Sequence, residues 1–506
     1  MELFIAFPNN SHASMSALEH LKRLTTEAAI VSSSASVLGW DQETYLPDQA
    51  HDWRARQLAW LAGRSHELST SQELSEALQA ALDEVHPADE RSLGNLREMQ
   101  RRFDRATKLP ASLVEKCSET SSRAKHAWAA ARKKSDFSLF APHLQSTLDL
   151  SREKAELWGY PEEPYDALIE TYERGATTAS VSKVFDELGP ELQEIAAAAV
   201  ERTQAKPAKL AAGPYPIHQQ MAFNEKVARA FGFDFDRGRI DTTTHPFCTT
   251  LGPADIRLTT RYDEGDFTSS LLGVLHETGH GLYEQGLRAE DFGQAADDSV
   301  SLGIHESQSR LWENHVGRSR EFWAHWLPIA ADHFPQLKST ALDDFLAFIH
   351  RAEFSFIRVE ADESTYDLHI LLRFDLERRL MRGDLKVSDV PAAWNESFEK
   401  SFGLTPPDDA NGCLQDIHWS MGGLGYFPTY TLGNLNAAQL FHASMRDESI
   451  KNACSEANYA PLLHWLRTKV HDHGATLDPA QIVRRATGSE ASAAAHLRHL
   501  RERYTK

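Results

Sequence analysis

The sequence predicts a mainly α-helical protein, a large helical body with one small antiparallel β element. Apolar residues recur at three- and four-residue spacing through most of the 506 residues, with charged residues between them. Only the stretch 240–265 breaks this pattern, because it is rich in Thr and β-branched residues around Gly252–Pro253, which predicts a short hairpin. No internal repeat or composition shift marks a boundary, so we expect a single domain over residues 15–506.

The predicted helices are spread along the whole chain. The helical spacing is clearest in the segments 16–40, 51–69, 92–107, 181–204, 268–285, 302–317 and 343–383. The stretches 205–216 and 403–434 contain Pro and Gly and predict loops. Residues 1–14 lack the helical pattern, so we interpret them as a disordered extension or a mis-assigned start ahead of Met15.

Composition excludes several classes of protein. Lys and Arg number 53 against 73 Asp and Glu, a formal net charge of -20, and no long basic patch offsets it, so we expect no nucleic-acid partner. No run of 18 apolar residues is present, which excludes a membrane-spanning helix, and the start carries no basic secretory signal. The four cysteines lie far apart, as is typical of reduced thiols in a cytoplasmic protein.

The stretch LLGVLHETGHGLYEQG, residues 271–286, carries the most specific chemistry. On a helix capped by Asp266, His276 and His280 lie one turn apart, with Cβ atoms about 6 Å from each other. Two imidazoles so placed can bind one Zn²⁺, and Glu277 beside them is the expected general base for a metal-activated water.

A short pattern of this kind also arises by chance on solvated helices. The flanking residues argue against chance, because Leu271, Val274 and Leu282 make the run apolar. The helix also contains Gly273, Gly279 and Gly281, which are poor helix formers and indicate that another backbone or a substrate approaches closely.

A third metal ligand is needed, because catalytic zinc usually takes three protein ligands and one water. No further histidine follows at the spacing of the extended motif, so the ligand is expected from the next predicted helix, 302–317. Glu306 is the best candidate there, and Glu313 and His305 are the alternatives.

Several motifs in order resemble one known family. HETGH followed by HESQSRLWEN is similar to the M32 carboxypeptidases, typified by carboxypeptidase Taq. Further family motifs are matched by GWDQETYLP (39–47), HPF (245–247), DIRLT (255–259), IRVEAD (357–362), GCLQDIHW (412–419) and GYFPTYTLG (425–433). The resemblance covers nearly the whole chain beyond residue 15.

The resemblance implies a fold and an activity. The fold would be a helical body with a deep substrate groove, with the β element beside the zinc site. The activity would be removal of single residues from peptide C-termini with broad preference. The family implies one zinc per chain, which cobalt can replace, and a homodimer. It assigns His276, His280 and Glu306 as metal ligands and Glu277 as the base.

Candidate substrate-binding residues follow from the chemistry. A free C-terminal carboxylate needs a fixed cation, for which Arg358 is favoured over Arg257, although Arg358 could instead pair with an acid of its own helix. Tyr426 and His418 are candidates to stabilise the developing oxyanion, and each could equally be a packing residue.

The strand DIRLTT is expected to line the groove, with His245 near the metal, and Asp362 is expected to orient a metal-binding histidine. Two kinds of rival remain. One is a gluzincin-type oligopeptidase or an aminopeptidase with the same zinc centre, and the other is a catalytically dead peptide-binding protein.

Overall fold

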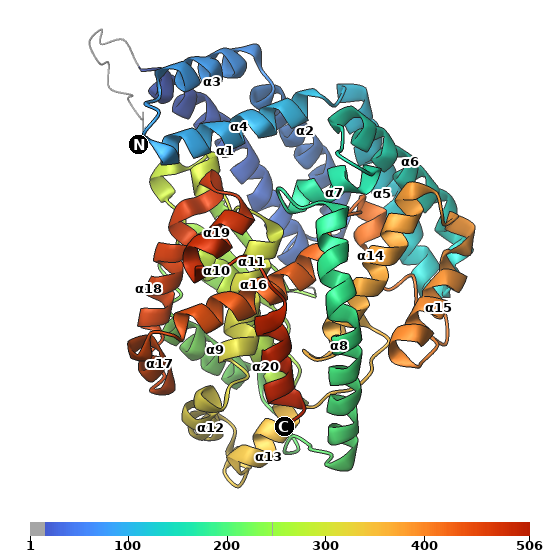
Figure 1. Ribbon diagram of the computed structural model, residues 1–506, viewed down its shortest axis with the longest axis vertical. Coiled ribbons are helices and arrows are strands. Elements are labelled where there is room, and N and C mark those ends of the chain that lie inside the picture. Colours follow the sequence, from blue (N-terminus) through green and yellow to red (C-terminus); the bar gives the residue numbers. More distant parts are fainter. Residues whose placement is uncertain (1–15, 245) are drawn as a thin grey trace.

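The computed structural model describes residues 16–244 and 246–506, and over this range the chain is built mainly of α-helices (Figure 1). The helices are α1 (Ala17–Thr44), α2 (His51–Ser69), α3 (Gln72–Glu84), α4 (Glu90–Thr107), α5 (Ala111–Lys134), α6 (Ala141–Trp158), α7 (Pro164–Tyr172), α8 (Thr178–Ala205), α9 (Ile217–Phe231), α10 (Phe267–Glu284), α11 (Leu302–Arg310), α12 (Arg320–His333), α13 (Leu342–Ile349), α14 (Tyr366–Arg382), α15 (Val390–Phe402), α16 (Pro428–Ser444), α17 (Glu448–Ser455), α18 (Ala460–Lys469), α19 (Pro479–Thr487) and α20 (Ala494–Tyr504). The mainly helical prediction is confirmed. The predicted extension 1–14 and His245 lie outside the described residues.

The segments predicted as helical contain eight of the twenty helices in the described part of the chain, and not every interruption was predicted. The segments 51–69 and 268–285 are α2 and α10 within one residue. The segment 343–383 is not one helix, because α13 ends at Ile349 and α14 begins at Tyr366, with an irregular crossing between them. The segment 302–317 is α11 followed by a π-helical turn, Leu311–Val316. The predicted loop 403–434 ends earlier, since Pro428 begins α16, where a proline at the first helical positions is well tolerated.

A three-stranded sheet stands where the hairpin was expected. Strands β2 (Cys248–Gly252) and β3 (Asp255–Thr260) pair antiparallel around Gly252–Pro253, as predicted. Strand β1 (Gly238–Thr242) adds to the other edge of β3 in parallel, so the sheet is mixed rather than antiparallel. Parallel pairing was not predicted because it needs a long connection and leaves no local turn signal.

Two apolar cores fill the molecule and meet at α16. The first surrounds α9 to α12 and the sheet, and the second surrounds α6 to α8, α14 and α15. Helix α16 contributes Ala437 and Leu440 to the first core and Leu435 to the second. In Figure 1, α17 and α18 lie on the opposite side of the molecule from α14 and α15, and α20 runs beside α8. Within the described chain, no helix has the length and apolar character needed to cross a bilayer.

Candidate metal centre and active site

Helix α10 places both histidines of the HETGH motif at the edge of the first core. The Asp266 carboxylate caps the helix by accepting from the backbone N–H of Thr268. Leu271, Val274, Leu275 and Leu282 are buried and fix the helix against that core. The side chains of His276 and His280 keep 20% and 13% of their surface exposed, so they remain accessible to a ligand.

Glycines bring the next helices close to this motif. A Cβ atom on Gly279 would lie 2.5 Å from the carbonyl oxygen of Gln308 and 2.6 Å from Cα of Ser309, so only glycine allows α11 to pack there. A Cβ atom on Gly433 of α16 would lie 2.6 Å from both Cβ and Cγ of Glu306. The contact at Gly279 confirms the expected close approach of another backbone. Gly281 is instead approached by side chains, and the nearest atom to a Cβ on Gly273 would be 3.7 Å away.

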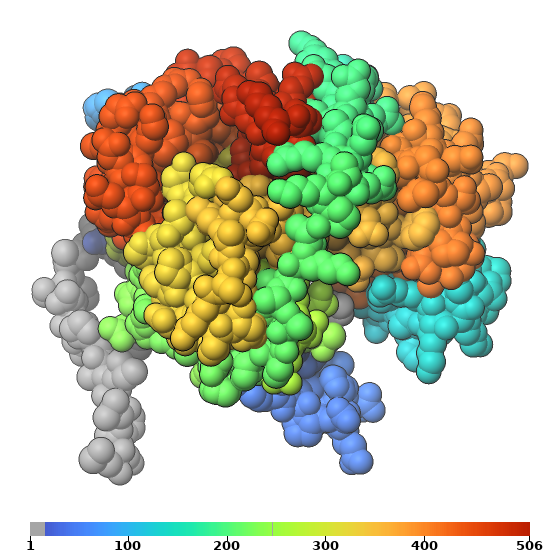
Figure 2. Space-filling view, turned by 90° about the horizontal axis from the view of Figure 1, so that it is seen from below, coloured from blue at the N-terminus to red at the C-terminus, as the bar shows by residue number. Residues whose placement is uncertain are grey.

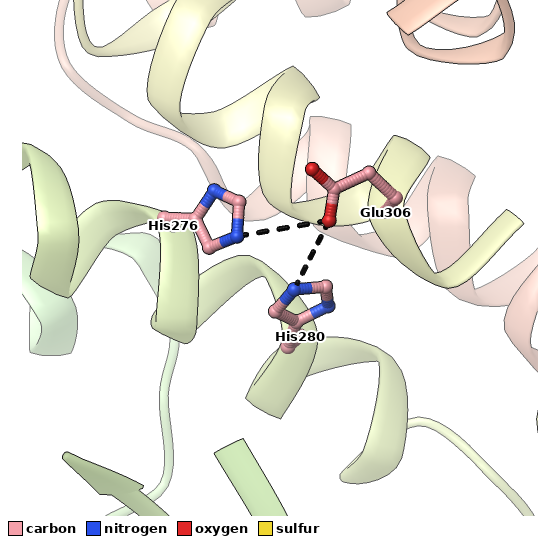
Figure 3. Close-up of side chains that lie close together, drawn as sticks. All are labelled: His276, His280 and Glu306. Atoms are coloured by element: carbon pink, nitrogen blue, oxygen red, sulfur yellow. Dashed lines mark ion pairs between the residues drawn. The ribbon is translucent and has the colours of Figure 1, made fainter. Parts of the chain in front are cut away.

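His276, His280 and Glu306 meet around one point, as Figure 3 shows. The Nε2 atoms of His276 and His280 lie 3.7 Å and 3.5 Å from the same oxygen of Glu306, Oε2. Atoms bound to one tetrahedral Zn²⁺ at 2.0–2.2 Å lie about 3.4 Å apart. The two nitrogens and the carboxylate oxygen therefore match the donor types and the spacing of a zinc site.

Glu306 is ionised and His280 is neutral, the protonation states that a metal ion requires of such ligands. Burial opposes ionisation of Glu306, but the charges of Arg310 and His276 outweigh it and hold the pKa of Glu306 well below its usual range. The guanidinium of Arg310 donates to Oε1 of Glu306 over 2.7 Å, which leaves Oε2 facing the histidines. Burial lowers the pKa of His280 to about 3, so its imidazole is neutral and can bind a metal.

Glu277 is a buried carboxylate with one oxygen unengaged. Its exposed fraction is 6%, and its Oε2 atom has no hydrogen-bond partner among the described residues. Burial raises the pKa of Glu277 to about 7, and the charge of Glu306 adds to the increase. A carboxylate tuned close to neutrality beside a cation site is suited to accept and return a proton.

Glu313, and not the predicted Asp362, contacts the Nδ1 atom of a motif histidine. Its Oε2 atom lies 2.9 Å from Nδ1 of His276, and Arg318 donates to its other oxygen over 3.1 Å. The Asp362 prediction is wrong, because that carboxylate accepts from the backbone of Glu353 and Ser364 and from the Thr365 hydroxyl. These donors satisfy both carboxylate oxygens of Asp362, which therefore stabilises the irregular segment between α13 and α14.

Arg358 lies in a cluster of cations and aromatic rings. It does not pair with an acid of its own helix, since residues 358–360 form one short 3₁₀ turn in the irregular crossing. Its Nε and Nη2 atoms donate to Asp416 over 3.1 and 2.9 Å, and Nη1 donates to the Tyr366 hydroxyl over 2.8 Å. Asp416 also accepts from Arg373, so two guanidinium groups share one carboxylate.

Two of the remaining candidates lie beside this cluster. The ring of His418 is 5.1 Å from that of Tyr426, and its Nε2 atom is 3.3 Å from the Tyr430 hydroxyl. Burial lowers the pKa of His418 to about 4, so it is neutral near pH 7. Burial and then the charge of Glu306 raise the pKa of Tyr426, which keeps its hydroxyl protonated and able to donate.

Arg257 is engaged on its own strand. Its guanidinium binds the carboxylate of Asp255 through two hydrogen bonds of 2.8 Å and stacks 4.2 Å from the ring of Trp40. The motif GWDQETYLP, which had no assigned role, therefore covers β3.

A cavity of about 750 Å³ lies between α8, α13 and α20 and is lined by none of the candidate residues (Figure 2).

Sequence reasoning missed four functional candidates. Arg310, Tyr366, Asp416 and Tyr430 surround the site, yet none was assigned a role. Asp416 stands inside the quoted motif GCLQDIHW, so an acid between two polar motif residues was the available signal. Arg310 lies four residues after Glu306, and this helical spacing could have indicated the pair.

Comparisons with known proteins agree with the fold. Thermostable carboxypeptidase 1 of Thermus thermophilus is 38% identical over 502 residues, covering 96% of this chain and 98% of the relative. Carboxypeptidase 1 of Bacillus subtilis is 36% identical over 480 residues, covering 94% and 95%. The crystal structure of the M32 carboxypeptidase from Deinococcus radiodurans superimposes with a TM-score of 0.93 at 38% identity, covering 96% of this chain and 98% of that one.

The family assignment rests on most of the chain rather than on the metal motif alone. The model of the family described as carboxypeptidase Taq (M32) metallopeptidase matches residues 20–504, which include both cores and every described candidate residue. With a relative above 30% identity across nearly the full length, the chain belongs to the carboxypeptidase Taq (M32) family of metallopeptidases.

Proposed function

We propose that the protein is a zinc-dependent carboxypeptidase that removes single residues from peptide C-termini with broad specificity. The convergence of His276, His280 and Glu306 on one point, with the unengaged carboxylate of Glu277 beside it, carries the proposal. Zinc held by these three residues would supply Lewis acidity and a nucleophile at neutral pH. Cobalt is the expected substitute, at one ion per chain.

The protein's own residues would move the proton and stabilise the developing charge. Glu277 takes the proton from the attacking water and returns it to the leaving amine, a role that matches a pKa of about 7. Tyr426 and His418 lie on the side of the Arg358 cluster and are the proposed donors to the developing oxyanion. Loss of one such donor typically reduces kcat by about 10²–10³.

Recognition of the substrate's C-terminal carboxylate is assigned to Arg358. A guanidinium offers five N–H groups, and three of those on Arg358 donate to Asp416 and Tyr366. The other two N–H groups of this buried side chain donate to no described residue, and Arg373 gives the cluster an excess positive charge over Asp416. Arg257 is the weaker candidate, because Asp255 already binds its guanidinium through two hydrogen bonds. His245 remains a candidate near the metal.

One experiment separates this proposal from its rivals. The purified protein, loaded with zinc, is given a peptide with a free C-terminus and the same peptide with a C-terminal amide. Stepwise loss of residues from the free acid alone supports the carboxypeptidase. Equal cleavage of both peptides contradicts it and favours an aminopeptidase or oligopeptidase, and cleavage of neither with retained zinc favours a peptide-binding protein. Removal of the metal by a chelator should abolish activity, and added zinc should restore it.

We also propose a homodimer located in the cytoplasm, following the family resemblance. The four cysteines are all free thiols in the structure, as a reducing compartment would require. Light scattering coupled to gel filtration measures the mass, for which a value near 56.8 kDa, that of one chain, would contradict the dimer.

A further inference from the structure

The second metal-binding histidine, His280, is supported differently from the first. Its Nδ1 atom faces Nδ1 of His305 on α11, and the two atoms form a short hydrogen bond. On the other side of the His305 ring, Nε2 lies 2.7 Å from Oε1 of Glu284. The other oxygen of Glu284 accepts from the hydroxyl of Thr250 on β2 over 2.7 Å. Three side chains therefore continue outward from His280 and end on the sheet.

These contacts fix which nitrogen carries each proton. When Nε2 of His280 faces the metal, its Nδ1 carries the hydrogen and donates to Nδ1 of His305. His305 must then carry its own hydrogen on Nε2, where it donates to the Glu284 carboxylate. Thr250 donates to the remaining oxygen, so each donor has one acceptor along the chain. Both nitrogens of His305 are used, which excludes it as a metal ligand in this arrangement.

We propose that His305 is a positioning residue of the metal centre, which holds His280 with Nε2 towards the metal and connects it to the negative charge of Glu284. The inference rests on the proposed metal centre. Glu284 follows His280 by one helical turn on α10, and the His305 ring lies between their side chains. His276 needs no such intermediate, because Glu313 contacts its Nδ1 directly.

A matched histidine separates this role from simple packing. The ring of His305 packs 5.3 Å from the ring of Tyr283, and the ring of His471 packs 5.0 Å from the same tyrosine. His471 also contacts α11, through Gln308 over 3.0 Å, but neither metal-binding histidine. Replacement of His471 therefore removes a buried imidazole beside α11 without changing the series of hydrogen bonds from His280 through His305 to Glu284.

The experiment measures zinc affinity by competition with a chromophoric chelator in the full-length wild type and in His305→Ala, His305→Gln, Glu284→Gln and His471→Ala. The dissociation constant for zinc should rise about 10–100-fold in His305→Ala, as is usual when the partner of a metal-binding histidine is lost. His305→Gln should recover part of the affinity, since an amide can accept from His280 and donate to Glu284. Glu284→Gln keeps a hydrogen-bond acceptor for His305 but removes the negative charge, so its zinc affinity should lie between those of His305→Ala and His305→Gln.

Visible spectra of the cobalt-substituted proteins report the geometry directly. The bands should shift in His305→Ala and remain as in wild type in His471→Ala, even where the metal-free His471 variant melts at a lower temperature. Wild-type zinc affinity in His305→Ala, or an equal loss in His471→Ala, would overturn the positioning role while leaving the proposed enzyme intact. Absence of zinc binding by the wild type would overturn both.

Discussion

The two sides of the candidate site carry groups of opposite charge and are assembled in different ways. On α10 and α11, the groups that face each other are close in sequence, and Glu313 contacts a histidine 37 residues before it. On the other side, Arg358 pairs with Asp416 across 58 residues, and both belong to irregular segments. Side chains that meet on neighbouring helices can be predicted from spacing, whereas the pairing of Arg358 with Asp416 joins two irregular segments and depends on long-range packing.

Their charges are complementary. The metal side gathers Glu277, Glu306 and Glu313 around two imidazoles, and the other side gathers Arg358 and Arg373 around Asp416. Burial opposes the charge of Asp416, but the two arginines outweigh it and keep its pKa well below the usual range. The acids and the arginines thus form two separate groups of charges. The guanidinium of Arg310, which donates to Glu306, lies 4.6 Å from the ring of Tyr366, whose hydroxyl accepts from Arg358.

The largest effect is expected on the metal side, from Glu277→Gln. The amide keeps the volume of the carboxylate but cannot accept a proton, so kcat/KM should fall by about 10²–10⁴. Zinc content, measured on the same sample by atomic absorption, should stay at the wild-type value because Glu277 is not a ligand. Loss of zinc together with activity would instead assign Glu277 to metal binding.

The arginine side should respond in stability. Asp416→Ala leaves two buried guanidinium groups without their carboxylate, which should lower the free energy of unfolding by about 3–5 kcal/mol. The control is Asp255→Ala, which removes the partner of Arg257 at a site where Asp255 is 42% exposed. That change should cost about 0–1 kcal/mol. Urea unfolding measures both, and equal losses would show that burial does not distinguish the two pairs.

The sequence predicted the metal side better than the arginine side for a physical reason. Helical spacing alone brings His276 and His280 together, and the next predicted helix, 302–317, contains Glu306. Asp362 was misassigned because its motif, IRVEAD, resembles part of a helix. In the structure this region is instead an irregular segment between α13 and α14, from which Phe354 and Phe356 pack on the second core. Strand β1 was missed because its partner, β3, is not the next strand along the chain, since β2 lies between them in sequence.

Glu173 connects the end of α7 to the start of α11 and should make stability depend on pH. It follows α7, and it accepts from the backbone N–H of Gly303 and the hydroxyl of Ser301 at the start of α11, the helix that carries Glu306. Burial raises its pKa from 4.5 to about 7. The folded protein therefore holds the proton more tightly than the unfolded chain does. The contribution to stability is complete below pH 4.5 and is lost as the pH rises to about 7.

The contribution of Glu173 to the free energy of unfolding that is lost between these pH values is on the order of 3 kcal/mol. Glu173→Gln removes the titrating group while keeping an acceptor for Gly303. Urea midpoints at pH 5 and pH 8 should differ less in this variant than in wild type. An unchanged difference would show that Glu173 does not titrate in this range.

The smallest effects come from two glycines of α10, which test how closely the helices of the metal side must pack. Gly279→Ala would place a Cβ atom against the backbone of Gln308 and Ser309, so α11 must move, at a cost of about 1–3 kcal/mol in unfolding free energy. Because α11 carries Glu306, zinc affinity should fall as well.

Gly273→Ala is the same substitution in the same helix, but its nearest neighbour, Oγ1 of Thr260, lies 3.7 Å away. Alanine favours the helix by up to about 1 kcal/mol there, so that variant should be at least as stable as wild type and bind zinc equally well. Thermal melting and zinc titration of Gly279→Ala and Gly273→Ala test this prediction. Equal melting temperatures and equal zinc affinities in the two variants would mean that contact between α10 and α11 does not set the position of Glu306.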